Sequence, residues 1–244
     1  AMKGVAGNKS VCLQALQAGN DMVLAPRRLK EEMDAVLEAV EKGELPEEEI
    51  NAKCRKVLTY KYILGLERKP FVKLSGLGTR INTPQTRDLI SRLNLAAITV
   101  LNNKNDVLPL HPDLKEAAIL NVGKPEEIEP FDRKMKKYTS FARFQLRKDL
   151  PEAEQQKLRD SLAAYRRVIV TVTEQRLASY QSFFAKFAPE SPVIYVFYTP
   201  AKSMLQIQRA VSVAEAVVLA HASRDDVQER VADLLFGKAT ADGR

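Results

Sequence analysis

The stretch VIVTV at residues 168–172 decides the fold class of the second half of this chain. It is a short apolar run of mostly β-branched residues, which is typical of a strand buried on both faces of a parallel sheet. Similar apolar runs occur on either side of it, at residues 97–101, 117–122, 141–146, 193–198 and 216–219. Each run has the length of a strand rather than of a helix.

Segments with helical spacing separate these runs. They cover residues 125–138, 151–166, 175–187, 201–213 and 225–236. Strands that alternate with helices are joined by crossover connections, so the sheet is mostly parallel and helices cover both of its faces. Residues 96–244 are therefore predicted to form an α/β domain.

The first 66 residues follow another pattern. Helical spacing begins after Asn8, a predicted N-cap, and returns at residues 29–40 and after Pro46. The apolar run DMVLA at 21–25 is too short for a helix and is predicted to be a buried parallel strand. Such a strand needs neighbours, which are either strands of the second half or strands that precede residue 1. We favour the second possibility, in which residues 1–66 are the end of a larger domain.

Residues 67–95 are predicted to connect the two parts. Pro70, Gly76 and Gly78 and a local excess of positive charge indicate a linker over residues 67–82. Thr83 and Pro84 then begin a helix.

Composition excludes several classes of function. The 38 Lys and Arg residues mostly alternate with 31 Asp and Glu, and Trp is absent, which argues against a nucleic-acid partner. No apolar run approaches the roughly 18 to 20 residues of a membrane span. Cys12 and Cys54 match no metal-ligand spacing and are predicted to be buried free thiols. The sequence does not determine the cellular compartment. A periplasmic or secreted location would fit a bacterial full-length protein.

The common signatures of nucleotide and acyl-transfer sites are missing. The chain contains no G-x-G-x-x-G, no G-x-x-x-x-G-K-[ST] and no G-x-S-x-G motif, so no cofactor and no metal are expected. His111 lies beside Pro112 and is predicted to be a solvated turn residue.

The loops that follow parallel strands meet at one edge of a sheet, where ligands bind in open α/β folds. This edge is predicted to include Gly123, Thr173, Thr199 and His221. The loop that begins at His221 also carries Arg224 and Asp225, and these three are the candidate substrate-binding residues because their side chains can hydrogen-bond a polar ligand. The alternative is that Asp225 and Asp226 cap the following helix.

Blocks in both halves of the chain resemble glycoside hydrolase family 3. In the first half they are ALQAGNDMVL at 15–24, AVEKGEL at 39–45 and VLTYKYILGL at 57–66. In the second half they are AITVLNNKNDVLPL at 97–110 and LFGKATADGR at 235–244. The resemblance implies the last part of that family's (β/α) barrel at 1–66, a linker and connecting helix at 67–95, and its C-terminal α/β sandwich at 96–244.

The resemblance also implies an activity. Family members hydrolyse β-linked sugars with retention of configuration, which requires a nucleophile and a proton donor. The family's aspartate nucleophile lies on the barrel strand just before Met2, so no catalytic residue of this chain is implied. In the β-N-acetylglucosaminidase branch the donor is a histidine on an earlier barrel loop. In the β-glucosidase branch it is a glutamate of the second domain within a K-H-F-x-x-N-type motif, which this chain lacks.

We therefore expect a fragment of a glycosidase that releases terminal β-N-acetylglucosamine, with the carbohydrate bound mainly through the barrel. Exposed apolar surface is expected on residues 1–66, with dimerisation as one way of covering it. Alternatives are β-glucosidase-type specificity and a non-catalytic carbohydrate-binding or interaction domain. A signalling domain similar to response regulators is disfavoured because the first strand is not followed by paired acids.

Overall fold

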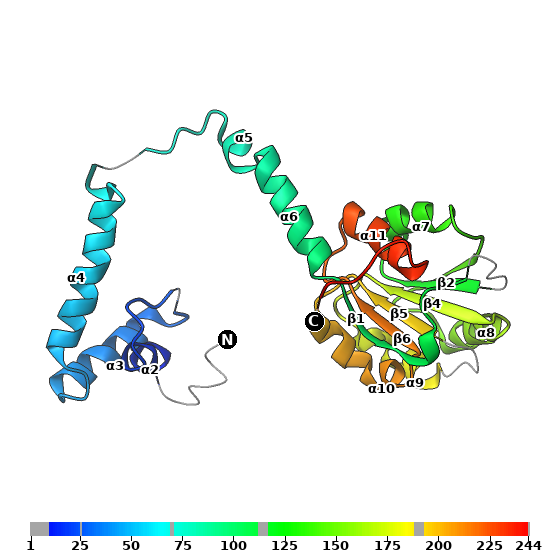
Figure 1. The fold of residues 1–244 in the computed structure, drawn as a ribbon. Coiled ribbons are helices and arrows are strands. Elements are labelled where there is room, and N and C mark those ends of the chain that lie inside the picture. The colour runs from blue at the N-terminus through cyan, green and yellow to red at the C-terminus, as the bar shows by residue number, and fades with distance from the viewer. Residues whose placement is uncertain (1–9, 25, 69–70, 112–116, 188–192, 244) are drawn as a thin grey trace. The chain divides into compact units, whose positions relative to one another are not determined.

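The computed structural model describes residues 10–24, 26–68, 71–111, 117–187 and 193–243. The chain divides into two compact units, Ala1–Leu77 and Gly78–Arg244 (Figure 1). The finer division at residues 66/67 and 95/96 stays a prediction.

The described part of the second unit contains a six-stranded sheet with the order β1-β6-β5-β4-β2-β3. The strands are β1 (Thr99–Asn103), β2 (Ala117–Val122), β3 (Ala142–Leu146), β4 (Arg167–Val172), β5 (Val193–Phe197) and β6 (Ala216–Leu219). Strand β1 is antiparallel to β6, and every other neighbouring pair is parallel. The predicted α/β class with a mostly parallel sheet is confirmed.

Helices cover both faces of this sheet (Figure 1). Helices α7 (Glu129–Met135) and α11 (Asp225–Leu235) lie on one face. The other face carries α8 (Glu152–Ala163), α9 (Gln181–Lys186), the 3-10 helix η5 (Ala201–Ile207) and α10 (Gln208–Ser212). Short 3-10 helices η3 (Pro125–Ile128) and η4 (Ala178–Tyr180) precede α7 and α9.

Two buried clusters form the core of this unit, one on each face of the sheet. Successive side chains of β2 point to opposite faces of the sheet, so Leu120 packs in one cluster and Ile119 in the other. Both side chains are fully or almost fully buried. Central parallel strands are covered on both faces, which explains why the strand runs in the sequence are mostly apolar, apart from polar residues such as Asn121 of β2 and Thr171 of β4.

A helix and a linker precede β1. Helix α6 (Pro84–Ala96) begins at Thr83, whose hydroxyl accepts a hydrogen bond from the Thr86 backbone N–H at 3.1 Å. Ala97 ends this helix, so β1 starts two residues later than predicted. A short 3-10 helix, η1 (Leu66–Arg68), overlaps the start of the predicted linker, and one turn of helix, α5 (Leu77–Ile81), lies near its end.

The described part of the first unit is helical, with α2 (Val11–Gln17), α3 (Leu29–Glu41) and α4 (Glu47–Ile63). Ser10 caps α2, because its hydroxyl accepts from the Leu13 backbone N–H at 3.1 Å and donates to Glu32 of α3. This replaces the cap predicted at Asn8, which lies outside the described residues. The Glu32 carboxylate also accepts from the Cys12 backbone N–H at 2.9 Å, so it joins the two helices.

The strand predicted at 21–25 is wrong for residues 21–24, which form no strand, while Ala25 lies outside the described residues. Met22 and Leu24 are 62% and 91% exposed. A strand needs a neighbour to receive its backbone hydrogen bonds, and the described residues of this unit include no other strand.

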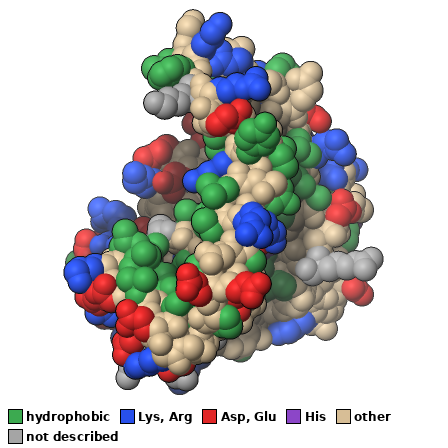
Figure 2. Space-filling model, turned by 90° about the vertical axis from the view of Figure 1, so that its left-hand side faces the viewer, with side chains coloured by type: hydrophobic (Ala, Val, Ile, Leu, Met, Phe, Trp, Pro, Cys, Tyr) green, Lys and Arg blue, Asp and Glu red, His purple; other side chains and the backbone are tan. Residues whose placement is uncertain are grey.

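Large apolar side chains of the first unit are exposed. Figure 2 shows exposed hydrophobic side chains, in green, between charged ones, in blue and red. The large apolar ones of the first unit are Met22, Leu24, Leu29, Met33, Leu37, Leu58, Tyr60, Tyr62, Ile63, Leu64, Leu66, Phe71, Val72 and Leu74. The expected dimer through this surface stays a prediction. Among the described helices, none combines the length and the apolar character that crossing a bilayer requires.

Candidate functional site

The carboxyl ends of four parallel strands meet at one edge of the sheet. Val122 of β2 pairs with Val172 of β4, Val172 with Phe197 of β5, and Phe197 with Leu219 of β6. The residues that follow these strand ends therefore lie along the same edge, as predicted for Gly123, Thr173, Thr199 and His221. This edge is where a doubly wound sheet presents its loops to a ligand.

A row of polar side chains stabilises part of this edge. The Asn121 amide donates to Gln145 at 2.9 Å and accepts from the Thr171 hydroxyl at 3.2 Å. Gln145 in turn donates to the backbone carbonyl of Gly123 at 2.7 Å. These bonds satisfy polar groups inside an apolar sheet and hold the loop after β2 in place.

An open hollow of about 420 Å³ lies at this edge, where the loops after β2, β3 and β4 come together. It is lined by Gly123, Lys124, Glu127, Lys148, Thr173, Glu174, Gln175, Arg176 and Tyr180. Its lining thus mixes cations, carboxylates, amides and a tyrosine, which are side chains able to bind a polar ligand.

Gly123 is required at the wall of this hollow. Its φ of +143° is one that residues with a side chain rarely adopt, and a Cβ atom built there would lie 1.8 Å from the Thr173 hydroxyl oxygen. The close approach arises because the Thr173 and Glu174 backbone N–H groups both donate to the Val122 carbonyl, at 3.0 and 3.2 Å.

We expect Gly123→Ala to lower the free energy of unfolding by about 1 to 3 kcal/mol, because the side chain adds backbone strain and a clash. Gly78→Ala is the matched control, since a Cβ there meets open space within helix α5 and alanine favours a helix. Urea unfolding of both variants measures the difference. Equal stabilities would contradict the argument.

Glu174 is a functional candidate that the sequence analysis missed. Its carboxylate lines the hollow and accepts from the Arg176 backbone N–H at 2.9 Å. Burial, together with Glu174 and Asp149 nearby, raises the pKa of Tyr180, so the phenol stays neutral. The position of Glu174, two residues after the run 168–172, places it at the same edge as His221 and is the signal that could have identified it.

The His221 loop is joined to the hollow through one backbone carbonyl. The Ser223 hydroxyl and the Gln228 amide both donate to the Glu127 carbonyl, at 3.2 and 2.8 Å. His221 is exposed and has a φ of +62°. The imidazole is thus available to a ligand, although it is not among the residues that line the hollow.

Arg224 and Asp226 form a local ion pair. Two nitrogens of the Arg224 guanidinium bind the Asp226 carboxylate at 3.1 and 3.3 Å, and Ser91 of α6 donates to the same carboxylate. Burial raises the pKa of Asp226, but hydrogen bonds from Ser91 and Arg224 outweigh it and leave this pKa below its usual range. Asp226 thus helps to hold α6 against α11.

Arg224 is also the N-cap residue of α11 and makes no side-chain cap bond, while Asp225 is exposed in the first turn. A carboxylate at this end of a helix interacts favourably with the helix dipole. The substrate-binding role predicted for His221, Arg224 and Asp225 stays a prediction.

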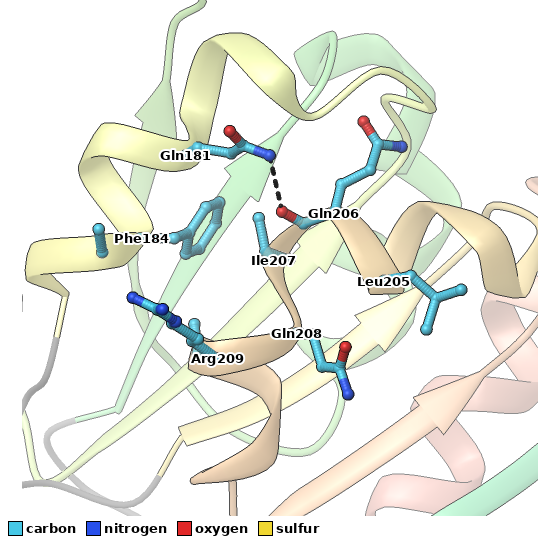
Figure 3. A pocket seen from close by; sticks show the side chains of 9 residues that line it. Gln181, Phe184, Leu205, Gln206, Ile207, Gln208 and Arg209 are labelled. Carbon is cyan, nitrogen blue, oxygen red and sulfur yellow. Dashed lines mark hydrogen bonds between the residues drawn. The ribbon is translucent and has the colours of Figure 1, made fainter.

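A second hollow lies between α9 and the segment formed by η5 and α10 (Figure 3). Phe184, Leu205 and Ile207 contribute apolar surface, and the Gln181 amide donates to the Gln206 carbonyl at 3.0 Å. Arg209 is the only ionisable side chain that the structure assigns to its lining. This hollow therefore lacks paired groups for acid–base chemistry.

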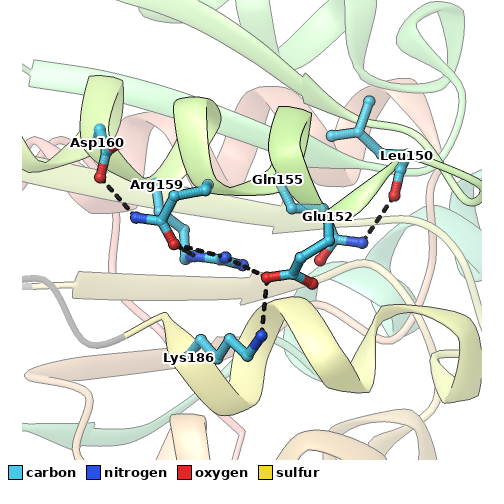
Figure 4. Close-up of polar contacts among 7 residues, drawn as sticks. Leu150, Glu152, Gln155, Arg159, Asp160 and Lys186 are labelled. Carbon is cyan, nitrogen blue, oxygen red and sulfur yellow. Dashed lines mark hydrogen bonds and ion pairs between the residues drawn. The ribbon is translucent and has the colours of Figure 1, made fainter.

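The charged cluster in Figure 4 joins α8 to α9. Glu152 accepts from Arg159 at 2.7 Å and from Lys186 at 2.8 Å, and these cations lower the pKa of Glu152. The Arg159 guanidinium lies 5.5 Å from the centre of the Phe183 ring. Because Arg159 is buried against this ring and is paired, the cluster is structural.

The other sequence candidates are placed as follows. His111 is exposed. Cys12 is buried, but Cys54 on α4 is exposed, so the prediction of two buried thiols is wrong for Cys54. Within residues 10–24, 26–68, 71–111, 117–187 and 193–243, no group of His, Cys, Asp or Glu side chains is arranged to hold a metal.

The first unit resembles a known family at the level of sequence. The profile described as "Glycosyl hydrolase family 3 N terminal domain" matches residues 1–60. A lysosomal beta glucosidase of Dictyostelium discoideum is 33% identical over 109 residues, which are 44% of this chain and 13% of that protein. The chain therefore spans only a small part of this curated relative.

Solved structures share the fold. The match to a beta-glucoside phosphorylase covers 96% of this chain and 44% of the phosphorylase, with a TM-score of 0.60 and 18% identity. The match to a family 3 beta-N-acetylglucosaminidase from a Paenibacillus species covers 96% of this chain and 46% of that protein, with a TM-score of 0.58 and 20% identity. The match to a beta-glucosidase from Listeria innocua covers 94% of this chain and 36% of that protein, with a TM-score of 0.54 and 14% identity. Residues 1–60 are thus similar in sequence to the N-terminal domain of glycoside hydrolase family 3, and the chain shares its fold with these solved structures.

Proposed function

We propose that this chain is part of a family 3 glycosidase that cleaves β-linked sugars with retention of configuration. The observation that carries the proposal is the match of residues 1–60 to the family's N-terminal domain, in the same chain as a family-like α/β unit. In this proposal the aspartate nucleophile lies on a barrel strand before Met2. The described chain then supplies the end of the barrel domain and the sandwich domain.

We propose terminal β-N-acetylglucosamine as the sugar. Support comes from the missing K-H-F-x-x-N-type motif, which belongs to the β-glucosidase branch, and from the fold shared with the Paenibacillus beta-N-acetylglucosaminidase. The second candidate is a β-glucoside. It is favoured by the 33% identity to a lysosomal beta glucosidase and by a glutamate, Glu174, at the ligand edge of the sandwich domain.

The test is the activity of the longer protein on two matched substrates, an aryl β-N-acetylglucosaminide and an aryl β-glucoside. We expect a higher kcat/KM for the first, with a β-configured sugar as the first product. A higher kcat/KM for the glucoside would replace the first candidate with the second. Absence of turnover on both would remove the glycosidase proposal and favour a binding or interaction domain.

Replacement of Glu174 is a second, independent test of which candidate sugar is the substrate. If the second candidate holds, Glu174→Gln removes the proton donor and lowers kcat by about 10² to 10⁴-fold, with loss of the alkaline limb of the pH profile. We expect instead that kcat of the longer protein on the N-acetylglucosaminide changes little, because its donor lies on the barrel. Glu126→Gln, an exposed change on η3, is the control.

We further propose that His221, Arg224 and Asp225 contact the substrate. His221→Gly removes the imidazole while glycine tolerates the positive φ, and we expect it to raise KM by about tenfold if one hydrogen bond to the substrate is lost. Arg224→Ala and Asp225→Ala are expected to act in the same direction. If KM is unchanged in all three variants and only the stability of Arg224→Ala falls, the loop does not bind substrate. Its role would then be to cap α11 and to anchor α6.

A further inference from the structure

Three cationic side chains surround the hollow at the carboxyl edge of the sheet. Lys124 follows β2, Lys148 follows β3 and Arg176 follows β4, and all three are exposed side chains that line the same hollow. Among the described residues, no ion pair is formed by any of them. Neighbouring cations behave differently, since Lys134 pairs with Asp233 at 3.0 Å and Arg143 with Asp132 at 2.5 Å.

A buried hydroxyl in the same hollow also lacks an acceptor. The Thr173 Oγ1 atom is shielded from solvent and has no hydrogen-bond partner among the described residues. A buried polar group without a partner costs about 1 to 3 kcal/mol, so a structure that keeps one is commonly completed by a ligand or a water molecule. The hydroxyl packs directly against Gly123, where a Cβ atom would lie 1.8 Å from it.

We propose that this hollow binds an oxyanionic group, a carboxylate or a phosphate, through Lys124, Lys148 and Arg176. Lysine provides a mobile point charge and arginine a planar pair of donors, and both bind carboxylates and phosphates strongly. The proposal does not depend on the glycosidase assignment, because it concerns binding at residues outside the barrel.

The carboxylates of the hollow favour one source of the oxyanion. Glu127 and Glu174 line the hollow together with the three cations, which leaves a small net positive charge. Such a lining suits a singly charged ligand that also carries hydroxyl groups, because the glutamates accept hydrogen bonds from hydroxyls and repel a second negative charge. A sugar acid therefore fits better than free phosphate.

The test is calorimetric titration of this protein at low ionic strength with three compounds. They are glucuronate, glucose, which is the uncharged counterpart of glucuronate, and inorganic phosphate. We expect glucuronate to bind, glucose to bind at least about tenfold more weakly, and rising salt to weaken the glucuronate complex. Binding of phosphate in place of glucuronate would support the oxyanion site and assign it to the free ion.

Variants locate the site. Lys148→Gln and Arg176→Gln are each expected to weaken glucuronate binding by about tenfold, the loss of one charge-assisted hydrogen bond. Lys157→Gln, an exposed change on α8, is the matched control and is expected to bind as the parent does. Equal binding of glucose and glucuronate, no binding of either anion, or binding unaffected by both hollow variants would overturn the proposal. Urea unfolding of each variant confirms that the fold is intact.

Discussion

Residues 1–244 alone are expected to release no measurable aglycone from aryl β-N-acetylglucosaminides or aryl β-glucosides. A retaining mechanism needs a nucleophile and a proton donor on opposite sides of the glycosidic bond. In the proposed function the nucleophile lies before Met2, so the chain lacks the group that forms the glycosyl–enzyme intermediate. We expect kcat/KM to fall by at least about 10⁴-fold relative to the longer protein, as is found when a nucleophile is removed.

The assay is release of the aryl group by the purified chain at micromolar concentration over hours. Glu174→Gln in the same chain is the contamination control, because activity from another enzyme is independent of it. Turnover by the chain that Glu174→Gln abolishes would contradict the placement of the nucleophile and would identify a catalytic centre in the α/β unit.

Phe131→Ala is expected to lower the free energy of unfolding by about 3 to 5 kcal/mol, because it leaves a large cavity between a helix and the sheet. The Phe131 ring is fully buried on α7 and contacts the Tyr198 ring edge to face, with centroids 6.1 Å apart. Its backbone N–H donates to Gln228 of α11 at 3.2 Å, so the site also joins the two helices of this face. Urea unfolding followed by circular dichroism measures the loss.

Phe71→Ala is the matched control for this substitution. The Phe71 side chain is 92% exposed, so its removal creates no cavity, and stability is expected to change by less than about 0.5 kcal/mol. A loss at Phe71 as large as that at Phe131 would show that the buried core of the second unit does not dominate stability.

The apolar runs in the sequence predict most strands of the second unit, because the central strands are buried on both faces. Residues 168–172 and 117–122 form β4 and β2 almost as predicted, since an apolar strand that is continuous in sequence must lie inside a parallel sheet. The start of a helix at Thr83 is predictable from residue type alone, because a hydroxyl there accepts a hydrogen bond from the backbone N–H three residues on. Such short-range interactions need no knowledge of the rest of the fold.

The first unit shows where this reasoning fails. The run at 21–25 has the composition of a strand, but the described residues 21–24 form no strand and two of their side chains are exposed. Strand formation depends on hydrogen bonds to another segment, which no local pattern specifies. The exposure of Cys54 has a similar cause, since burial depends on what covers a helix face rather than on the residue type.

The sequence by itself determined the α/β class, the helix and strand order of residues 96–244, and the strand edge at which Gly123, Thr173 and His221 lie. Only the tertiary structure decided which side chains at that edge share one hollow. Lys124, Lys148 and Arg176 are separated by more than 20 residues from one another along the chain. They meet because β3, β2 and β4 are neighbours in parallel register, and the sheet order that brings them together follows from long-range packing.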